Sequence, residues 1–146
     1  MTRFWRYIAA ALGLAVVLAG VAAAIHLAAP GRQGSDFSRS KATVAGLFVV
    51  TIGPESGAVR LGESQAWTLR LSTPQGTPVE NAAIDVSGGM PQHAHGLPTS
   101  PQVTEYLGDG RYRIEGVKFS MHGWWQLRVG VSAAAGSDTV VFNIAL

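Results

Sequence analysis

Two imidazoles and a thioether lie close together in one short stretch of the sequence. The stretch GGMPQHAHGLPTSP, which begins at Gly88, contains Met90, His93 and His95 in a chain with only four histidines and three methionines. In an extended segment, residues two apart point to the same side, which would let His93 and His95 bind one metal ion together. Imidazole suits zinc, copper and nickel, and a thioether adds a preference for Cu(I). The alternative is a surface turn whose three side chains share no ligand.

The chain contains no cysteine, and this restricts the metal ligands and the nucleophiles that it can offer. Thiolate zinc sites and thiol redox reactions are excluded, so His, Met, Asp, Glu or backbone atoms would have to hold any metal. A nucleophile would have to be a serine or threonine beside a histidine and a carboxylate. Ser120 is close to His122 in the sequence, but neighbouring residues at a strand end point apart, and no acidic residue is placed to orient the ring. The residues predict a binding protein and not an enzyme.

The N-terminal part of the chain has the composition of a membrane segment. The chain is 47% hydrophobic and 14% charged, whereas soluble domains have about 25% charged residues. The difference comes from residues 7–30, which contain no Asp, Glu, Lys or Arg. About 20 apolar residues cross a bilayer as a helix, and Arg3 and Arg6 before the run favour a cytoplasmic N-terminus. Everything after Pro30 is then expected outside the cytoplasm.

Two interpretations of residues 1–30 remain open, a cleaved signal peptide and a retained single-pass anchor in a bacterial cytoplasmic membrane. The small residues of AAA and LAA offer peptidase sites, but the apolar run is longer than the roughly 7–15 residues of a signal-peptide core. Its length favours the anchor. Residues 31–41, GRQGSDFSRSK, are expected to form a polar tether. The net charge is only +2 and the basic residues are scattered, so we do not expect a nucleic-acid-binding face.

From residue 42 onward, short apolar runs alternate with Gly, Pro, Asp and Ser. Trp67, Leu69 and Leu71 alternate with polar residues, and the runs WWQLRVGVSA and DTVVFNIAL repeat this pattern. TVAGLFVVTI and PVENAAIDVSG are also expected to be strands, and GDG between QVTEYL and RYRIEGVKF can supply the positive φ angles of a hairpin turn. Roughly seven short strands within about 100 residues predict an all-β fold. We expect an immunoglobulin-like antiparallel β-sandwich over residues 42–146, preceded by one N-terminal transmembrane helix.

Strand direction is expected to bring a second His/Met stretch, SMHGWW, beside the first. If the strand that ends near Ser87 runs up, then QVTEYL runs down and RYRIEGVKF runs up again in an antiparallel fold. Met121 and His122 should therefore lie at the same end of the sandwich as the first stretch. Three interpretations of His122 remain: a metal ligand, a residue that contacts the ligands from behind, or a solvent-facing turn residue. The predicted ligands of a copper ion, as Cu(I) or Cu(II), are Met90, His93, His95, Met121 and His122.

The run MPQHAHGLPTSPQVTEYLGDGRYRIEGVKFSMHGWWQLRV, which begins at Met90, resembles the FixH and YtkA-like families of small bacterial proteins. The shared pattern is M-P-x-H-x-H-G, then G-D-G-x-Y, then F-x-M-x-G-x-W. The resemblance implies an N-terminal anchor, an extracytoplasmic immunoglobulin-like domain and a role in copper delivery or in assembly of cbb3-type oxidases. By position, it implies Met90, His93, His95 and Met121 as metal ligands. Such proteins often have proline where this chain has His122, so the sequence departs from the pattern there.

The sequence supports two functional hypotheses. The first is a membrane-anchored metallochaperone whose domain lies in the periplasm or another extracytoplasmic space, where it binds copper and passes it to a copper-accepting or respiratory membrane protein. The second is an accessory or assembly module for a membrane complex such as a cbb3-type oxidase, with the His/Met loop as a contact surface that holds no metal. Both hypotheses place the chain at the inner membrane, and neither involves nucleic acid.

Overall fold

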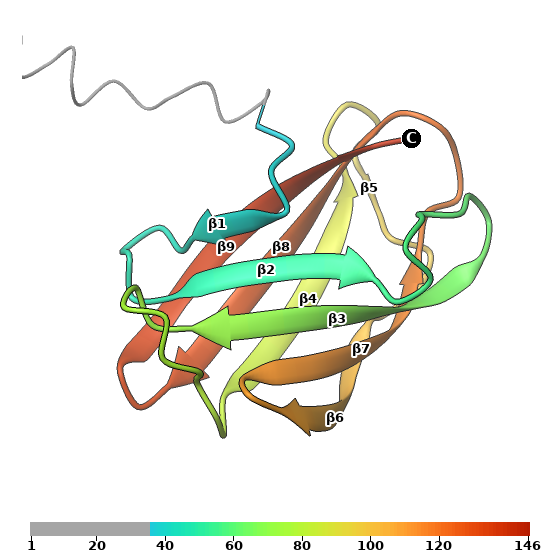
Figure 1. Cartoon of the computed structure of the whole chain (residues 1–146). Coiled ribbons are helices and arrows are strands. Elements are labelled where there is room, and N and C mark those ends of the chain that lie inside the picture. The colour runs from blue at the N-terminus through green and yellow to red at the C-terminus, as the bar shows by residue number, and fades with distance from the viewer. Residues whose placement is uncertain (1–35) are drawn as a thin grey trace, which may run out of the picture. The chain divides into compact units, whose positions relative to one another are not determined.

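Two antiparallel β-sheets face each other in the computed structural model, which describes residues 36–146 (Figure 1). Within this range the first sheet has the strand order β1-β2-β3-β7-β6, and the second has the order β5-β4-β8-β9. The all-β antiparallel sandwich that the alternating runs predict is confirmed for these residues. The strands are β1 Ser40–Ala42, β2 Val49–Pro54, β3 Ser64–Ser72, β4 Ala83–Met90, β5 His95–Gly96, β6 Gln102–Gly108, β7 Arg111–Lys118, β8 Trp124–Ala133 and β9 Gly136–Ala145.

The predicted membrane segment, residues 1–30, and the first part of the predicted tether, residues 31–35, lie outside the described residues. The rest of the expected tether enters the first sheet, because β1 begins at Ser40 and pairs with β2. Nothing in residues 36–146 provides a helix with the length and hydrophobicity needed to cross a membrane.

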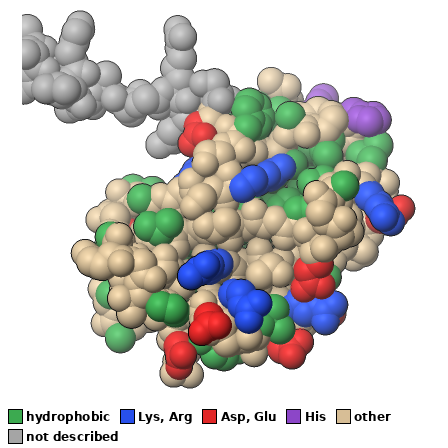
Figure 2. Space-filling model, in the orientation of Figure 1, with side chains coloured by type: hydrophobic (Ala, Val, Ile, Leu, Met, Phe, Trp, Pro, Cys, Tyr) green, Lys and Arg blue, Asp and Glu red, His purple; other side chains and the backbone are tan. Residues whose placement is uncertain are grey.

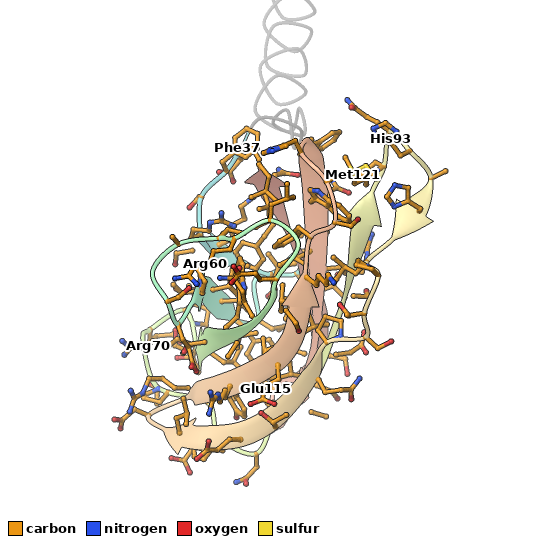
Figure 3. All side chains as sticks on the ribbon, turned by 90° about the vertical axis from the view of Figure 1, so that its right-hand side faces the viewer. Phe37, Arg60, Arg70, His93, Glu115 and Met121 are labelled. Atoms are coloured by element: carbon orange, nitrogen blue, oxygen red, sulfur yellow. The ribbon has the colours of Figure 1, made fainter. Side chains whose placement is uncertain are left out.

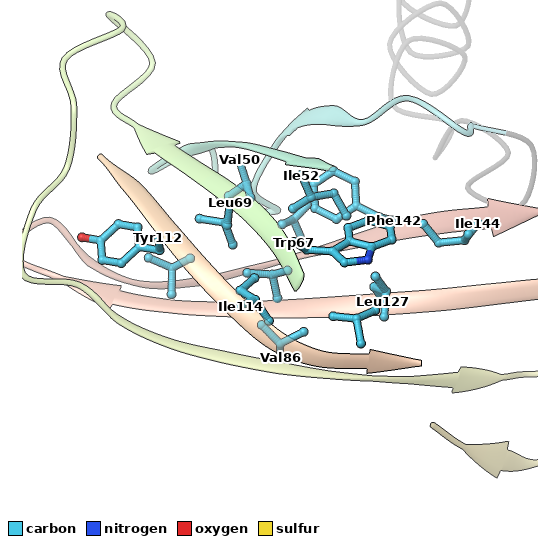
Figure 4. Packing of buried hydrophobic residues seen from close by; sticks show 14 of the residues in the cluster. Val50, Ile52, Trp67, Leu69, Val86, Tyr112, Ile114, Leu127, Phe142 and Ile144 are labelled. Carbon is cyan, nitrogen blue, oxygen red and sulfur yellow. The ribbon is translucent and has the colours of Figure 1, made fainter. Parts of the chain in front are cut away.

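Alternate residues of the long strands fill the core between the two sheets (Figure 4). In β3, Trp67, Leu69 and Leu71 are buried while Arg70 is exposed. This is the alternation that the sequence predicts, with one face of the strand buried and the other in water. β8 and β9 follow the same pattern, with buried side chains at Trp125, Leu127, Val129, Val131, Val140, Phe142 and Ile144.

The segment expected as the first long strand, residues 43–52, is instead part loop and part strand. β2 starts only at Val49, because residues 43–48 form a turn that includes Gly46 with φ +73°. The Asp138 carboxylate of β9 accepts the backbone N–H of Ala45 at 3.0 Å and holds this turn against the second sheet. Asp138, which holds the turn before β2, is therefore far away in the sequence, and the local alternation of residues 43–52 could not reveal its role.

The strand directions confirm the expected convergence of the two His/Met stretches. β4 and β8 are antiparallel neighbours with Gly89 opposite Gln126, so the end of β4 adjoins the start of β8. β6 and β7 pair across the GDG turn, where Asp109 has φ 52° between two glycines that also have positive φ. The connection 119–123 between β7 and β8 therefore lies at the same end of the sandwich as the turn 91–94 after β4.

Candidate metal centre

One end of the sandwich carries all five predicted ligands, and we call it the His/Met end. Figure 3 shows His93 and Met121 together at this end, on neighbouring connections of the chain. Hydrophobic side chains lie beside the histidines on the surface in Figure 2. The residues that define the His/Met end are Met90, His93, His95, Met121 and His122.

The closest link between the two His/Met stretches is a contact of Met90 with Gly123. Met90 is the last residue of β4, and its side chain is only 2% exposed. A Cβ atom at Gly123 would lie 2.7 Å from the Met90 Cε, and Gly123 has φ +134°, a conformation that side-chain-bearing residues rarely adopt. Glycine at this position therefore allows the connection 119–123 to lie directly on the Met90 thioether.

His93 and His95 are close in space, although residues 91–94 form a turn and not the extended segment considered above. The His93 N–H donates to the Met90 carbonyl oxygen at 3.0 Å, and Ala94 has φ 53°. The chain then pairs back onto β4, with His95 opposite Met90. The two imidazole rings stack with centroids 5.9 Å apart and planes at 29°, and both residues are exposed.

Gly89 in β4 makes room for the short strand β5. A Cβ atom at Gly89 would lie 2.5 Å from the His95 carbonyl oxygen and 3.0 Å from the Gly96 Cα. Real Cβ atoms do not approach backbone this closely, so a side chain at Gly89 would push β5 away from β4. Gly89 thus positions His95.

Trp125 connects both His/Met stretches, a role that the sequence did not reveal. Its burial was predicted, since it continues the alternation of β8 and is fully buried. Its indole N–H also donates to the Met121 carbonyl oxygen at 3.0 Å. The His95 ring meets the indole edge-to-face, with centroids 5.8 Å apart. One buried side chain therefore fixes the backbone of one stretch and supports an imidazole of the other.

Leu146, which directly follows β9, also holds the connection that carries Met121 and His122. Gly123 and Leu146 exchange two backbone hydrogen bonds, of 2.9 and 3.1 Å. The side chains of Met121 and His122 remain outside this paired backbone and are exposed, Met121 to 41%. The backbone of the connection is thus fixed at Gly123 while its two candidate ligands face solvent.

The candidate ligands comprise imidazoles and thioethers without a carboxylate partner. In residues 36–146, no group of three or more His, Asp or Glu side chains is arranged to hold a metal ion. If side chains alone supply three or four ligands at the His/Met end, at least one of them is therefore a thioether. A donor set of this kind favours a soft ion.

Of two hollows on the described surface, the smaller is lined by two of the candidate ligands, Met90 and His95. It has a volume of about 320 Å³ and lies beside His95, over Gly89, Gln126 and Arg128. The larger one, about 590 Å³, lies at the opposite end around Ile84 and Thr139 and has no histidine or methionine in its lining. The smaller hollow is therefore the one beside candidate ligands, although His93, Met121 and His122 do not line it.

Comparison with known proteins gave one family and a structural neighbour. A family described as YtkA-like matches residues 48–130, a range that includes all five candidate ligands. A solved structure of a DUF4426 family protein from Pseudomonas aeruginosa PAO1 is similar, with a TM-score of 0.54 and 19% identity, covering 75% of this chain and 96% of that chain. At this identity the likeness concerns the fold alone. The search of curated proteins gave no match.

Proposed function

This chain belongs to the YtkA-like family, and from that premise we propose that it is a membrane-anchored, extracytoplasmic copper-binding protein that delivers the ion to a partner. The proposal includes an immunoglobulin-like sandwich and a single-pass N-terminal helix in a bacterial cytoplasmic membrane. The domain would lie in the periplasm or another extracytoplasmic space. It acts by binding and release, without catalysing a reaction.

The observation that carries this proposal is the contact between the two His/Met stretches. Met90 lies against Gly123, and Trp125 joins the Met121 backbone to the His95 ring. Imidazole and thioether donors from both stretches are thereby gathered at one end of the domain, although they are distant in the sequence.

Copper is the ion that this mixture of donors suits best. Neutral imidazole nitrogen binds copper in both oxidation states, and thioether sulfur favours Cu(I) over zinc. The chain has no thiolate to offer, because it lacks cysteine. We assign His93 and His95 to Cu(I) or Cu(II), and Met90 and Met121 to Cu(I). His122 is a candidate additional ligand.

Exposure of the ligands fits delivery of the ion to another protein. Met121 and the two imidazoles of the 91–95 stretch are open to solvent, so an incoming donor atom can reach the ion directly. Met90 is buried beneath Gly123 and is the innermost donor. His93, Met121 and His122 lie on connections between strands, which move with less disturbance of the core than the strands that carry Met90 and His95.

Copper competition with the full-length protein in detergent tests the proposal. The purified chain is titrated with Cu(I) in the presence of a chromogenic Cu(I) chelator, alongside the His93→Ala/His95→Ala double variant and the Met121→Ala variant. We expect the parent to retain Cu(I) at micromolar free copper and both variants to lose it to the chelator.

The His122→Ala variant serves as an informative comparison, since His122 is exposed at the same end. An affinity equal to the parent's would remove His122 from the ligand set without affecting the proposal. If the parent does not retain copper, or if the double variant matches it, the copper role is wrong and the metal-free assembly module for a membrane complex becomes the better explanation.

A further inference from the structure

The described chain enters the domain at the His/Met end. The Asp36 carbonyl oxygen accepts a hydrogen bond of 2.8 Å from the Asn143 side chain, and the Asn143 Oδ1 accepts the Trp124 indole N–H at 3.0 Å. Trp124 is the first residue of β8 and directly follows Gly123. Asp36 also pairs with Lys41 at 3.0 Å. The entry point of the chain is therefore fixed beside the candidate ligands and not at the opposite end.

Exposed apolar side chains accompany the candidate ligands at the same end. Among the described residues, three of the five large hydrophobic side chains that are exposed lie here: Phe37 next to Asp36, Leu61, and Met121. Leu61 is placed by its neighbour Gly62, whose N–H donates to the Phe119 carbonyl oxygen at 2.8 Å. Exposed apolar side chains with polar residues beside them are a feature of surfaces that bind another protein.

The cations near this end are not arranged for binding to anionic lipid. Lys41 is paired with Asp36, Arg60 is paired with Glu63 at 3.3 Å, and Arg39 lies over an indole ring. Arg128 is exposed beside the hollow that contains His95, and Lys118 ends β7. Recognition of anionic lipid headgroups usually uses clusters of about 4–8 Lys and Arg side chains, more than these two cations provide. The surface chemistry therefore favours a protein partner over the lipid surface.

The length of chain before Asp36 limits where that partner can be. Only residues 31–35 separate the apolar run 7–30 from Asp36. A fully extended chain spans at most about 3.6 Å per residue, so this connection can reach no farther than about 20 Å. The turn at the opposite end of the domain is separated from the His/Met end by the ten residues of β8, about 33 Å at the usual rise.

We propose that the His/Met end, with Phe37 and Leu61 beside the candidate ligands, is the docking surface for a protein embedded in the same membrane, with which copper is exchanged. This inference rests on the proposed anchor and copper role. The short connection keeps the ligands near the outer surface of the bilayer, where the metal-binding opening of an integral membrane protein can meet them. A soluble carrier would have to approach through the same narrow space.

Orientation is tested first, without metal, by energy transfer to labelled lipids. The absence of cysteine allows single labelling sites, and Gln92 and Gln75 are exposed glutamines in turns at the His/Met end and at the opposite end. Full-length Gln92→Cys and Gln75→Cys proteins carry a donor dye in phosphatidylcholine vesicles with acceptor-labelled headgroups. We expect several-fold stronger transfer from position 92. Equal transfer, or stronger transfer from position 75, would overturn the proposed orientation. Because no copper is present, this result is independent of the copper test.

The partner is tested by photo-crosslinking in intact cells that express the full chain. p-Benzoylphenylalanine replaces Leu61 in one variant and Tyr106 in the other, since both side chains are similarly exposed but lie at opposite ends. We expect position 61, and not position 106, to form adducts with a protein that resists carbonate extraction from the membrane. Adducts with lipid alone, with soluble proteins alone, or equally at both positions would overturn the inference.

Discussion

At the scale of single residues, Trp125 is the side chain on which the geometry of the candidate centre depends most. We expect Trp125→Phe to weaken Cu(I) binding, because phenylalanine keeps an aromatic ring against His95 but cannot donate to the Met121 carbonyl. Loss of the hydrogen bond costs about 1 kcal/mol of folding stability, and the cavity left by the smaller ring adds to this loss because Trp125 is fully buried. Denaturant unfolding and chelator competition measure the two effects.

Trp124→Phe is the matched control for that variant. It removes an indole hydrogen bond of the same length, to Asn143, from the neighbouring residue without touching His95 or Met121. We expect a smaller loss of stability, because Trp124 is only half-buried, and an unchanged copper affinity. Equal losses of affinity in the two variants would mean that Trp125 acts through general stability and not by positioning the ligands.

Asp138 makes the folding stability of the domain depend on pH in the acidic range. Burial alone would raise the pKa of this carboxyl group, but hydrogen bonds from Thr43 and from the N–H groups of Ala45, Thr139 and Leu47 outweigh it and lower the pKa to about 2. The ordinary value is 3.8. Because the pKa is lower in the folded state, the charge stabilises the fold fully above the ordinary value, and this stabilisation is lost as pH falls through about 2.

Replacing Asp138 with asparagine removes the charge that stabilises the fold at neutral pH. The variant should be less stable than the parent at neutral pH, and the difference should shrink as the pH is lowered from 4 toward 2. Urea unfolding of both proteins across this pH range measures it. A difference that stays constant with pH would show that packing of the side chain, and not its charge, holds the 43–48 turn.

At the scale of elements, the short strand β5 determines where His95 lies. We expect Gly89→Ala to displace β5, because the new Cβ would overlap the His95 carbonyl and Gly96. Overpacking of this kind costs about 1–3 kcal/mol. The copper affinity of the Gly89→Ala protein should fall further than that of a control protein in which another glycine of the same sheet is replaced by alanine.

Gly130→Ala in β8 supplies that control, since its Cβ would meet only the Asp85 Cβ, at an ordinary 3.8 Å. Circular dichroism checks that both variants keep the sandwich, and chelator competition compares their affinities. A Gly89→Ala protein that binds copper as well as the Gly130→Ala protein would mean that β5 pairing does not position a ligand.

The elements also show which features the sequence could predict. The alternation in β3, β8 and β9 and the GDG turn are local patterns, and two reversals of direction suffice to bring the ends of β4 and β7 together. The pairing of β5 with β4 depends on the absence of a side chain at Gly89. The start of β2 at Val49, and not at residue 43, depends on Asp138. These contacts join distant residues or involve a missing side chain, so no periodicity signals them. Trp125 looked like an ordinary core residue for the same reason.

At the scale of the whole molecule, binding at the His/Met end should stabilise the entire sandwich. The two sheets share one continuous core, to which Met90 and Trp125 both belong. A ligand that binds only the folded state stabilises it by about 2.7 kcal/mol when its free concentration is about 100 times the dissociation constant. We therefore expect Cu(I) to raise the melting temperature of the full-length protein, as followed by tryptophan fluorescence.

The His93→Ala/His95→Ala variant should show no such rise. Without metal it should unfold slightly below the parent, because both imidazoles are exposed but the His95 ring packs against Trp125. A rise of equal size in the variant would place the stabilising copper elsewhere on the chain. Zn²⁺ at the same free concentration should give a smaller rise, since the thioethers favour Cu(I).

The two backbone hydrogen bonds between Leu146 and Gly123 bear on how the protein can be purified and labelled. A purification tag that begins directly after Leu146 would start beside Gly123, the residue that follows Met121 and His122. A hexahistidine tail there would supply competing nitrogen donors and inflate any copper stoichiometry. An affinity handle inserted in the turn that holds Gln75 would keep such foreign donors at the far end of the domain.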